Sequence, residues 1–353
     1  MAKRKLTRRQ AWRIQKIQDE RTQRAQRREQ RSDEALNEGD LGPEQHGVII
    51  AHYGKLIDVE ALSAAQDEEG VMHLGDGSAP IKRCHFRTNL GSLVTGDRVI
   101  WRDGNPNGVV VSRLPRTSEL SRPDPYGDMK TVAANIDCIF IVVAPFPQPH
   151  ASLIDRYLVA AERSGMRPVL LMNKADRFDD NNRAEMQQLL AVYRELGYEV
   201  LTVSTKTGAS LAQLNQELVG RTSVFVGQSG VGKSSLVNAL LPDSDLKVGA
   251  LSEATQKGTH TTTTAQLFHF PAGGHLIDSP GIREFGLWQL DARELIEGFV
   301  EFRPFLGHCK FRDCAHLQEP GCAINDALAR GAISKQRMDS YRYILSTLQA
   351  PDG

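Results

Sequence analysis

The chain has 353 residues, 40% of them hydrophobic and 24% charged, which suits a globular protein of two or three domains. The sequence contains no run of about 18 apolar residues, so we expect no membrane span and no membrane partner. It has no apolar signal-peptide core near its start, and its five cysteines are too few for a disulfide scaffold in a chain of this length. We therefore expect a cytoplasmic protein and, since no dimerisation signal stands out, a monomer.

The formal net charge of zero conceals a strongly basic N-terminal arm, which we assign to residues 1–40. Residues 1–31 contain twelve Lys or Arg and three acidic residues, a net charge of +9, so the rest of the chain carries a net charge of −9. Such an asymmetry indicates a polyanionic partner, most often a nucleic acid. A solubilising tail is the alternative interpretation.

Residues 45–114 are predicted to form a small β-barrel. Five short apolar stretches in this region are separated by Gly, Asp and Asn turns, which is the pattern of short strands. About five strands in about 65 residues fit an OB-fold. That fold commonly binds RNA or single strands, although a small barrel also serves as a protein-interaction module. The predicted strands are Val48–Ala51, Ile57–Val59, Ile81–Cys84, Asp97–Trp101 and Gly108–Val111.

After a connector rich in Pro and Arg (Arg113–Lys130), apolar strands alternate with helices, and we assign residues 118–288 to one domain. The alternation predicts a doubly wound α/β domain with a mostly parallel sheet. The predicted strands are Ile136–Ala144, Pro168–Met172, Glu199–Val203, Arg221–Val226 and His275–Ile277. The predicted helices are Leu153–Gly165, Arg183–Leu196, Leu211–Leu218 and Ser234–Leu241.

Gly227–Ser234 matches the phosphate-binding motif G-x-x-x-x-G-K-[ST] in full, between a predicted strand and a predicted helix. Its glycines let backbone N–H groups curl round the β-phosphate, and the following helix offers its positive N-terminus. Lys233 is expected to reach the β- and γ-phosphate oxygens, and the Ser234 hydroxyl to ligate Mg²⁺. The predicted nucleotide contacts in this loop are Gly227, Gln228, Ser229, Gly230, Val231, Gly232, Lys233, Ser234 and Ser235.

A second motif selects guanine. Asn173, Lys174, Ala175 and Asp176 form N-K-x-D directly after a predicted apolar strand. A carboxylate at Asp176 can accept hydrogen bonds from the N1–H and the exocyclic amine of guanine, which adenine does not offer. Ser204 and Thr205 follow the next predicted strand, where a further loop is expected to contact the base. The nucleotide is therefore predicted to be GTP or GDP.

Two further segments complete the predicted phosphate site. Asp278–Gly281 reads Asp-Ser-Pro-Gly after a predicted strand, so Asp278 can hold Mg²⁺ through water and the Gly281 N–H can meet the γ-phosphate. Residues 258–264 form a polar loop with five threonines. Such a loop suits a switch segment in which one threonine ligates Mg²⁺ when the γ-phosphate is present.

The C-terminal region, residues 289–353, is predicted to be a small helical domain built round a metal ion. Its expected helices are Asp291–Phe302, Ala323–Arg330 and Ser334–Leu348. Cys309, Cys314, His316 and Cys322 lie between the first two. Three thiolates and one imidazole suit a structural tetrahedral Zn²⁺ with no open coordination position.

The order of the motifs is unusual. In ordinary GTPases the P-loop comes first, but here Asp176 and Ser204 precede it, and Asp278 follows it. The sequence therefore predicts a circularly permuted domain, which is tolerable when the original termini lie close together at the surface. With the His-Thr-Thr-Thr segment, the Asp-Ser-Pro-Gly turn and the Cys/His cluster, the chain from Gly47 to about Leu348 resembles the RsgA (YjeQ) family of bacterial GTPases.

The resemblance implies an OB-fold, a permuted GTPase domain and a zinc-binding helical domain. It also implies binding to the small (30S) ribosomal subunit and its 16S rRNA late in maturation, with slow GTP hydrolysis that the subunit stimulates. Other assembly factors are open as partners. Thr262 aligns best with the threonine of the family that senses Mg²⁺, although one extra threonine leaves Thr261 and Thr263 as alternatives.

Ras-like enzymes orient the attacking water with a Gln after D-x-x-G, but here that position is Ile282, which has no hydrogen-bonding group. We therefore expect slow hydrolysis without a partner. His260 is the candidate replacement, because an imidazole near neutral pKa can position or polarise water. The alternative is that His260 only packs or contacts rRNA. The candidate catalytic residues are thus His260, Thr262 and Lys233.

Two other functional classes fit parts of the pattern. The chain could be a nucleotide-gated RNA-binding adaptor in which hydrolysis is incidental, or a switch GTPase for a non-ribosomal protein. Negligible stimulated turnover would identify the first. Absence of salt-sensitive rRNA binding would identify the second.

Overall fold

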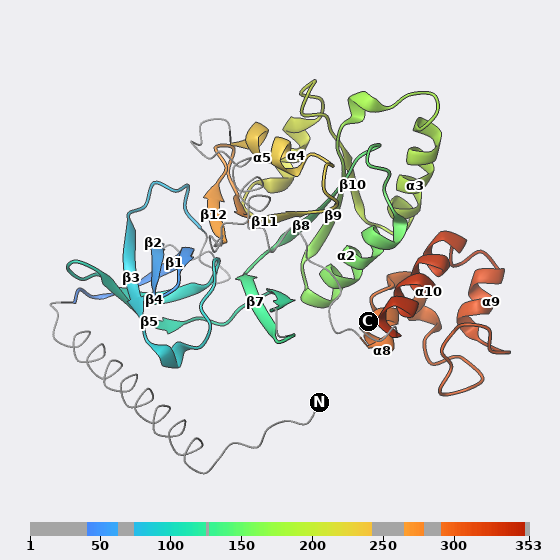
Figure 1. The fold of residues 1–353 in the computed structure, drawn as a ribbon, viewed down its shortest axis with the longest axis horizontal. Helices are drawn as coiled ribbons and strands as arrows, with labels where there is room; N and C mark the ends of the chain where they lie inside the picture. The colour runs from blue at the N-terminus through green and yellow to red at the C-terminus, as the bar shows by residue number, and fades with distance from the viewer. Residues whose placement is uncertain (1–40, 63–73, 125–126, 242–264, 279–290, 350–353) are drawn as a thin grey trace, which may run out of the picture.

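The computed structural model describes residues 41–62, 74–124, 127–241, 265–278 and 291–349. A β-barrel lies at one end, an α/β domain in the middle and a small helical domain at the other end (Figure 1). The predicted three-part architecture is therefore confirmed, while the basic arm lies outside the described residues. Within these ranges no helix is both long enough and apolar enough to cross a membrane.

The five strands of the barrel match the five predicted ones. They are β1 (Glu44–Tyr53), β2 (Leu56–Ala61), β3 (Ile81–Phe86), β4 (Arg98–Arg102) and β5 (Gly108–Arg113), with a short 3₁₀ turn, η1 (Thr88–Leu90), before β4. β1 pairs with both β2 and β4, and β3 runs parallel to β5, so the sheet closes on itself. Gly47 lies where β1 crosses the core, and a Cβ there would be 2.5 Å from a methyl group of Val59.

The connector predicted at 113–130 contains structure that the sequence analysis did not predict. β6 (Glu119–Pro123) and β7 (Met129–Ala134) pair as an antiparallel hairpin. Its residues Leu120, Ala133 and Ala134 are fully buried. Figure 1 shows β7 between the barrel and the α/β domain. The hairpin is therefore a packed element at the junction of the two domains.

The α/β domain has a six-stranded sheet in the order β10-β9-β8-β11-β13-β12. Its strands are β8 (Cys138–Val143), β9 (Arg167–Met172), β10 (Glu199–Thr202), β11 (Thr222–Val226), β12 (Gln266–His269) and β13 (His275–Asp278). All neighbours are parallel except β12 and β13. Its helices are α2 (Ala151–Ser164), α3 (Arg183–Glu195), α4 (Leu211–Leu218) and α5 (Lys233–Leu240), with a 3₁₀ turn, η2 (Ala175–Arg177).

Both faces of the sheet are covered, which explains the continuous apolar runs of its strands. In β8, Ile139 and Ile141 belong to the core that includes α2 and α3, whereas Phe140 and Val142 belong to the core that includes α4 and α5. Successive side chains of a strand point to opposite faces. In a strand that is buried on both faces, every side chain enters an apolar core, so apolar and polar residues do not alternate along it.

β12 is a strand that the sequence analysis did not predict, and it joins the two sheets. It pairs antiparallel with β13 on one side and with β1 of the barrel on the other, through Ala51 and Gln266. The strands of the barrel and of the α/β domain thus form one hydrogen-bonded sheet. β12 is the physical link between the barrel and the strand that ends at Asp278.

The helical domain consists of α8 (Ala292–Glu297), the 3₁₀ segment η4 (Val300–Phe305), α9 (Ala323–Ala329) and α10 (Lys335–Gln349). The helix predicted at 291–302 is interrupted at Gly298, where a Cβ would lie 2.4 Å from a Val159 methyl on α2. Phe299, Phe302 and Tyr341 share one buried core with α2. The helical domain is therefore packed against the α/β domain through a common apolar core.

Candidate nucleotide-binding site and zinc cluster

The predicted nucleotide motifs meet at one edge of the α/β sheet. Asn173 follows β9, Ser204 follows β10 and Gly227 follows β11, while β13 ends at Asp278. These four strands and β8 are mutually parallel, so their carboxyl ends lie on the same side. Ligands of open α/β sheets bind in the crevice outside these ends. The topology thus brings together motifs that the sequence separates.

The phosphate loop adopts backbone angles that favour glycine. Gly227, Gly230 and Gly232 have φ values of 134°, 83° and 98°, in the range that residues with a Cβ rarely adopt. A Cβ on Gly227 would lie 2.2 Å from the Val142 carbonyl oxygen, so this glycine is also required by the close approach of β8. The loop then opens directly into α5 at Lys233, as a P-loop requires.

The Lys233 ammonium lies over the loop that it is predicted to serve. Its Nζ donates to the carbonyl oxygens of Gly227 at 2.6 Å and Gln228 at 2.8 Å. These contacts hold the positive charge at the mouth of the loop. Ser234 lies half-buried in the first turn of α5 and Ser235 is exposed.

Asn173 joins the guanine motif to the phosphate loop. Its side chain is fully buried, and its Nδ2 donates to the Val231 carbonyl oxygen at 3.0 Å. Its own backbone N–H donates to the Val143 carbonyl at 2.8 Å. Among the described residues its Oδ1 has no hydrogen-bond partner. The first residue of N-K-x-D therefore fixes the position of one loop against the other.

Lys174 has a left-handed backbone conformation with φ of 57°, and its extended stem crosses the phosphate loop. Its Nζ donates to the Phe146 carbonyl at 3.1 Å and to the Gly230 carbonyl. Desolvation lowers the pKa of this ammonium. The stem is thus held in one place, where it can cover one face of a base.

Asp176 and Ser204 form the contact between the two predicted base-binding loops. The Ser204 hydroxyl donates to Asp176 Oδ1 at 2.6 Å and accepts from the Thr207 N–H at 3.3 Å. The hydrogen bond from Ser204 lowers the pKa of the Asp176 carboxyl. Ala175 N–H donates to the Val203 carbonyl at 3.1 Å. The carboxylate is therefore ionised and oriented to accept hydrogen bonds. Thr205, which follows Ser204 in sequence, is partly buried.

Several predicted residues lie outside the described part of the chain. They are His260, Thr261, Thr262, Thr263, Gly281 and Ile282. Asp278, at the end of β13, is described and partly buried. The predicted Mg²⁺ contacts that the structure locates are thus Ser234 and Asp278.

The four predicted zinc ligands converge. The ligand atoms of Cys309, Cys314, His316 and Cys322 all lie within 4.8 Å of one another. The His316 Nδ1 lies 3.4 Å from Cys309 Sγ and 3.5 Å from Cys322 Sγ, close to the nitrogen–sulfur separation of about 3.5 Å that a tetrahedral ion with a Zn–N bond of about 2.0 Å and a Zn–S bond of about 2.3 Å gives. Three sulfurs and one nitrogen at these separations fit one zinc ion.

Glu319 shapes the loop that carries two of these ligands. Its carboxylate accepts from the N–H groups of Ala315 and Leu317, both at 2.8 Å, while His316 between them has a φ of 60°. The strained backbone at His316 is thereby held in a fixed turn. The imidazole is presented to the sulfurs by a hydrogen-bonded loop.

Comparison with known proteins identifies the family. The model described as RsgA GTPase matches residues 113–288. The small ribosomal subunit biogenesis GTPase RsgA of Azotobacter vinelandii is 59% identical over 100% of both chains. That of Pseudomonas aeruginosa is 58% identical, again over 100% of both. The chain belongs to the RsgA family.

Solved structures of similar proteins agree with the fold. YjeQ from Thermotoga maritima superposes with a TM-score of 0.69 and 28% identity, covering 88% of this chain and 100% of that chain. YloQ, described as a circularly permuted GTPase, gives a TM-score of 0.67 and 28% identity, covering 88% and 98%. The predictions of an RsgA-type GTPase and of its circular permutation are therefore confirmed.

One side of the region beside the P-loop in this RsgA-family protein is formed by residues that the sequence did not predict. An apolar pocket beside the P-loop is lined by Pro147, Pro149 and Leu153, together with Gly227 and Gln228. The signal was present in the Pro-Phe-Pro-Gln-Pro run that follows β8. Its contribution could not be recognised without the sheet order, which places β8 beside β11.

Proposed function

We propose that this protein hydrolyses GTP in the late maturation of the small (30S) ribosomal subunit, which it binds through 16S rRNA. The observation that carries the proposal is the meeting of a guanine-reading loop and a phosphate loop at one sheet edge, locked by the Asn173–Val231 hydrogen bond. Relatives that match the chain over its whole length are named small ribosomal subunit biogenesis GTPases.

The residues are assigned roles by their chemistry. Asp176 accepts the hydrogen bonds of guanine, with Ser204 and Thr205 beside the base. Lys233 and the backbone N–H groups of the P-loop neutralise the β- and γ-phosphates. Ser234 would ligate Mg²⁺ together with Thr262, which is assigned by its resemblance to the switch threonine of the family; Asp278 would hold the ion through water, and the Gly281 N–H would meet the γ-phosphate. His260 positions the attacking water, since Ile282 has no hydrogen-bonding group to do so.

A zinc ion bound by Cys309, Cys314, His316 and Cys322 has a structural role. All four ligands come from the protein, which leaves no coordination position for a substrate or water. The ion ties the loop between η4 and α9 into a fixed shape. It would thereby stabilise the helical domain in addition to the apolar core that this domain shares with α2.

Two parts of the chain are suited to rRNA. The basic arm, residues 1–40, supplies a net positive charge that lowers the free energy of contact with phosphates. On the barrel, the Arg83 guanidinium lies 4.8 Å from the centre of the Tyr53 ring, and Tyr53 is 48% exposed. An exposed aromatic ring with an adjacent guanidinium can stack on unpaired bases. The setting is the cytoplasm, with the protein as a monomer when free.

The deciding experiment measures steady-state GTP turnover of the full chain alone, with purified 30S subunits and with 50S subunits as the control. We expect low turnover alone, a clear rise with 30S subunits and none with 50S subunits. The variant His260→Ala should bind GTP normally and lose the stimulated rate. Equal rates with both subunits would refute the proposal. Guanine binding with no stimulated turnover would instead identify an RNA-binding adaptor.

A further inference from the structure

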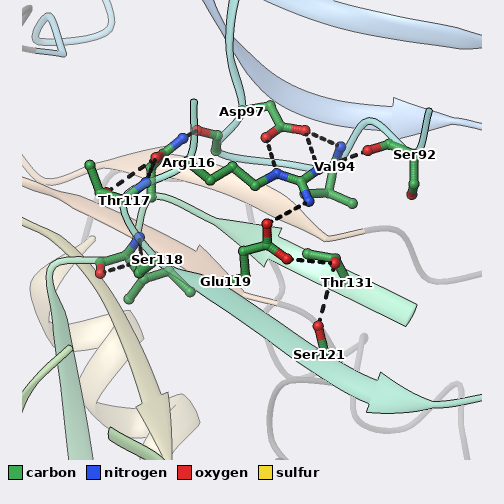
Figure 2. Close-up of polar contacts among 12 residues, drawn as sticks. Ser92, Val94, Asp97, Arg116, Thr117, Ser118, Glu119, Ser121 and Thr131 are labelled. Carbon is green, nitrogen blue, oxygen red and sulfur yellow. Dashed lines mark hydrogen bonds and ion pairs between the residues drawn. The ribbon is translucent and has the colours of Figure 1, made fainter. Parts of the chain in front are cut away.

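The barrel loop at 92–97 is fixed by a buried ion pair to Arg116, in the connector that leads into β6. Asp97 is fully buried, and its carboxylate accepts from Arg116 Nε at 2.6 Å, from Arg116 Nη2 at 2.8 Å and from the Val94 N–H at 2.8 Å. Arg116 also donates to the Ser92 carbonyl at 2.7 Å and lies 3.3 Å from Glu119 on β6. Figure 2 shows the Arg116 guanidinium between Asp97, Ser92 and Glu119. An ion pair with its hydrogen-bonding groups satisfied holds such a loop in one conformation.

A second set of contacts fixes the same loop from the β7 side. Asn135 Nδ2 donates to the Gly96 carbonyl at 2.8 Å, and Asn135 Oδ1 accepts from the Thr117 N–H at 2.9 Å. Gly96 has a φ of 91°, and a Cβ there would lie 2.1 Å from the Ala134 carbonyl oxygen. The Ala134 N–H donates to the Thr95 carbonyl at 3.1 Å. The backbone of Thr95 is therefore held by Ala134, and its neighbour Gly96 is held by Asn135.

From this position Thr95 reaches the start of β12. Its side chain is 1% exposed, and its hydroxyl donates to the Ala265 carbonyl at 2.8 Å. The next residue, Gln266, pairs with Ala51 of the barrel on one side and with Asp278 on the other. A short path of hydrogen-bonded contacts thus runs from a barrel threonine to the aspartate at the nucleotide edge. Ala265 also directly follows the threonine run in sequence.

We propose that Thr95 is a positioning residue for GTP hydrolysis, which fixes the start of β12 and through it the place of Asp278 relative to the bound metal. The inference rests on the proposed role of Asp278 as the residue that holds Mg²⁺ through water. A carboxylate that acts through water depends on its distance from the ion, so a small displacement of β12 changes metal affinity and turnover. The barrel is in this way part of the hydrolytic machinery as well as a binding module.

The test compares Thr95→Val, Thr95→Ser and Thr131→Val in the full-length protein. Valine keeps the shape of threonine and removes the donor, whereas serine keeps the donor. Thr131 is the matched control, because its hydroxyl donates to Glu119 Oε2 at 3.2 Å in the same junction (Figure 2). We expect Thr95→Val to lower kcat about 5-fold and to raise the Mg²⁺ concentration for half-maximal turnover, with the affinity for GDP without metal unchanged. Thr95→Ser and Thr131→Val should behave as the parent protein.

A purely structural role for Thr95 would lower thermal stability and nucleotide affinity together and leave the Mg²⁺ dependence unchanged, and that result would overturn the inference. So would an unchanged kcat in Thr95→Val. The variant Asp278→Asn distinguishes a failure of the proposed Asp278 role from a failure of the Thr95 role. If it keeps full turnover, the proposed metal role of Asp278 fails. If it loses turnover while Thr95→Val does not, only the role of Thr95 fails.

Discussion

Asn173 lies so close to Gly232 of the phosphate loop that a Cβ on the glycine would be 2.4 Å from Asn173 Nδ2. The same Nδ2 donates to the Val231 carbonyl. The predicted base-binding loop and the predicted phosphate loop are therefore one packed unit. Nucleotide affinity should depend on this contact as much as on groups that touch the ligand.

Replacing Gly232 with alanine is expected to lower the affinity for GDP and GTP by at least about 10-fold. The residue has a φ of 98°, which costs about 1 kcal/mol or more for a residue with a Cβ, and the added methyl displaces Asn173. The control is Gly220→Ala, where φ is 70° but nothing lies within 4 Å of the added Cβ. Titration with a fluorescent GDP analogue measures both. Similar losses in the two variants would show that strain alone is responsible.

Asp176→Asn should abolish the preference for GTP over ATP and weaken GTP binding by about 100-fold. The carboxylate has two oxygens that can accept from the N1–H and the exocyclic amine of guanine, whereas the amide has one oxygen and an NH₂ group that cannot accept. The matched control is Asp180→Asn, an exposed aspartate that follows η2. Competition of ATP and GTP against the same fluorescent analogue gives the ratio. A retained preference for GTP in Asp176→Asn would locate guanine recognition elsewhere.

The sequence predicts the α/β strands well because burial on both faces leaves an uninterrupted apolar run, as in Cys138–Ala144. β6 and β7 are missed for the opposite reason. Of their eleven residues, Leu120, Ala133 and Ala134 are the buried ones, too few for a period. β12 has four residues, and it is stabilised by strands that the chain reaches only through folding, β1 of the barrel among them.

For the site, the motifs predict which residues gather, since each follows a strand, and the parallel sheet then places them at one edge. The supporting contacts could not be predicted. The Phe146 carbonyl that accepts from Lys174 and the Val231 carbonyl that accepts from Asn173 are backbone atoms. Every residue has a backbone carbonyl, so the residue types Phe and Val do not show that these groups accept hydrogen bonds from the site. Only the order of the strands in the sheet brings the carbonyls into place.

Acid should destabilise the fold through His275. Burial, with a contribution from the neighbouring His269, lowers the pKa of His275 from 6.5 to about 4. Between about 6.5 and about 4, only the unfolded chain binds this proton, so unfolding becomes more favourable as pH falls, by up to about 1.4 kcal/mol per pH unit. Below about 4 this group adds nothing further.

Chemical denaturation at a series of pH values tests this expectation. The slope of the unfolding free energy against pH should flatten in His275→Gln. His85→Gln, which removes an exposed imidazole from β3, should keep the parent slope over the same range. An unchanged slope in His275→Gln would mean that other groups cause the acid sensitivity.

Elemental analysis should find one zinc ion per chain, and Cys314→Ser should reduce this content sharply. The ligand set is closed and comes from a single loop region, so losing one thiolate removes a quarter of the coordination. Cys138→Ala is the control, because Cys138 is a buried core residue of β8. Full zinc content in Cys314→Ser would exclude this cluster as the site.

Chelation should also lower the melting temperature of the whole chain, since α9 and α10 share a core with α2.

Arg337 of α10 is fully buried where the helical domain packs against α2. Its Nη1 donates to Asp155 Oδ1 at 2.5 Å, and its Nε and Nη2 donate to the two oxygens of Glu301 at 2.6 and 3.0 Å. The guanidinium also lies 4.3 Å from the centre of the Phe299 ring. Replacing one partner of such a group leaves buried carboxylates without a counter-charge, which costs about 3–5 kcal/mol.

Arg337→Met should therefore lower the free energy of unfolding by about this amount, measured in urea. The triple change Arg337→Met, Asp155→Asn and Glu301→Gln should recover part of the loss, because it removes the orphaned negative charges. The exposed pair Arg293–Glu297 provides the control, and Arg293→Met is expected to cost less than about 1 kcal/mol. If Arg337→Met and Arg293→Met cost the same, the buried pair does not hold the helical domain on α2, and the common apolar core does so alone.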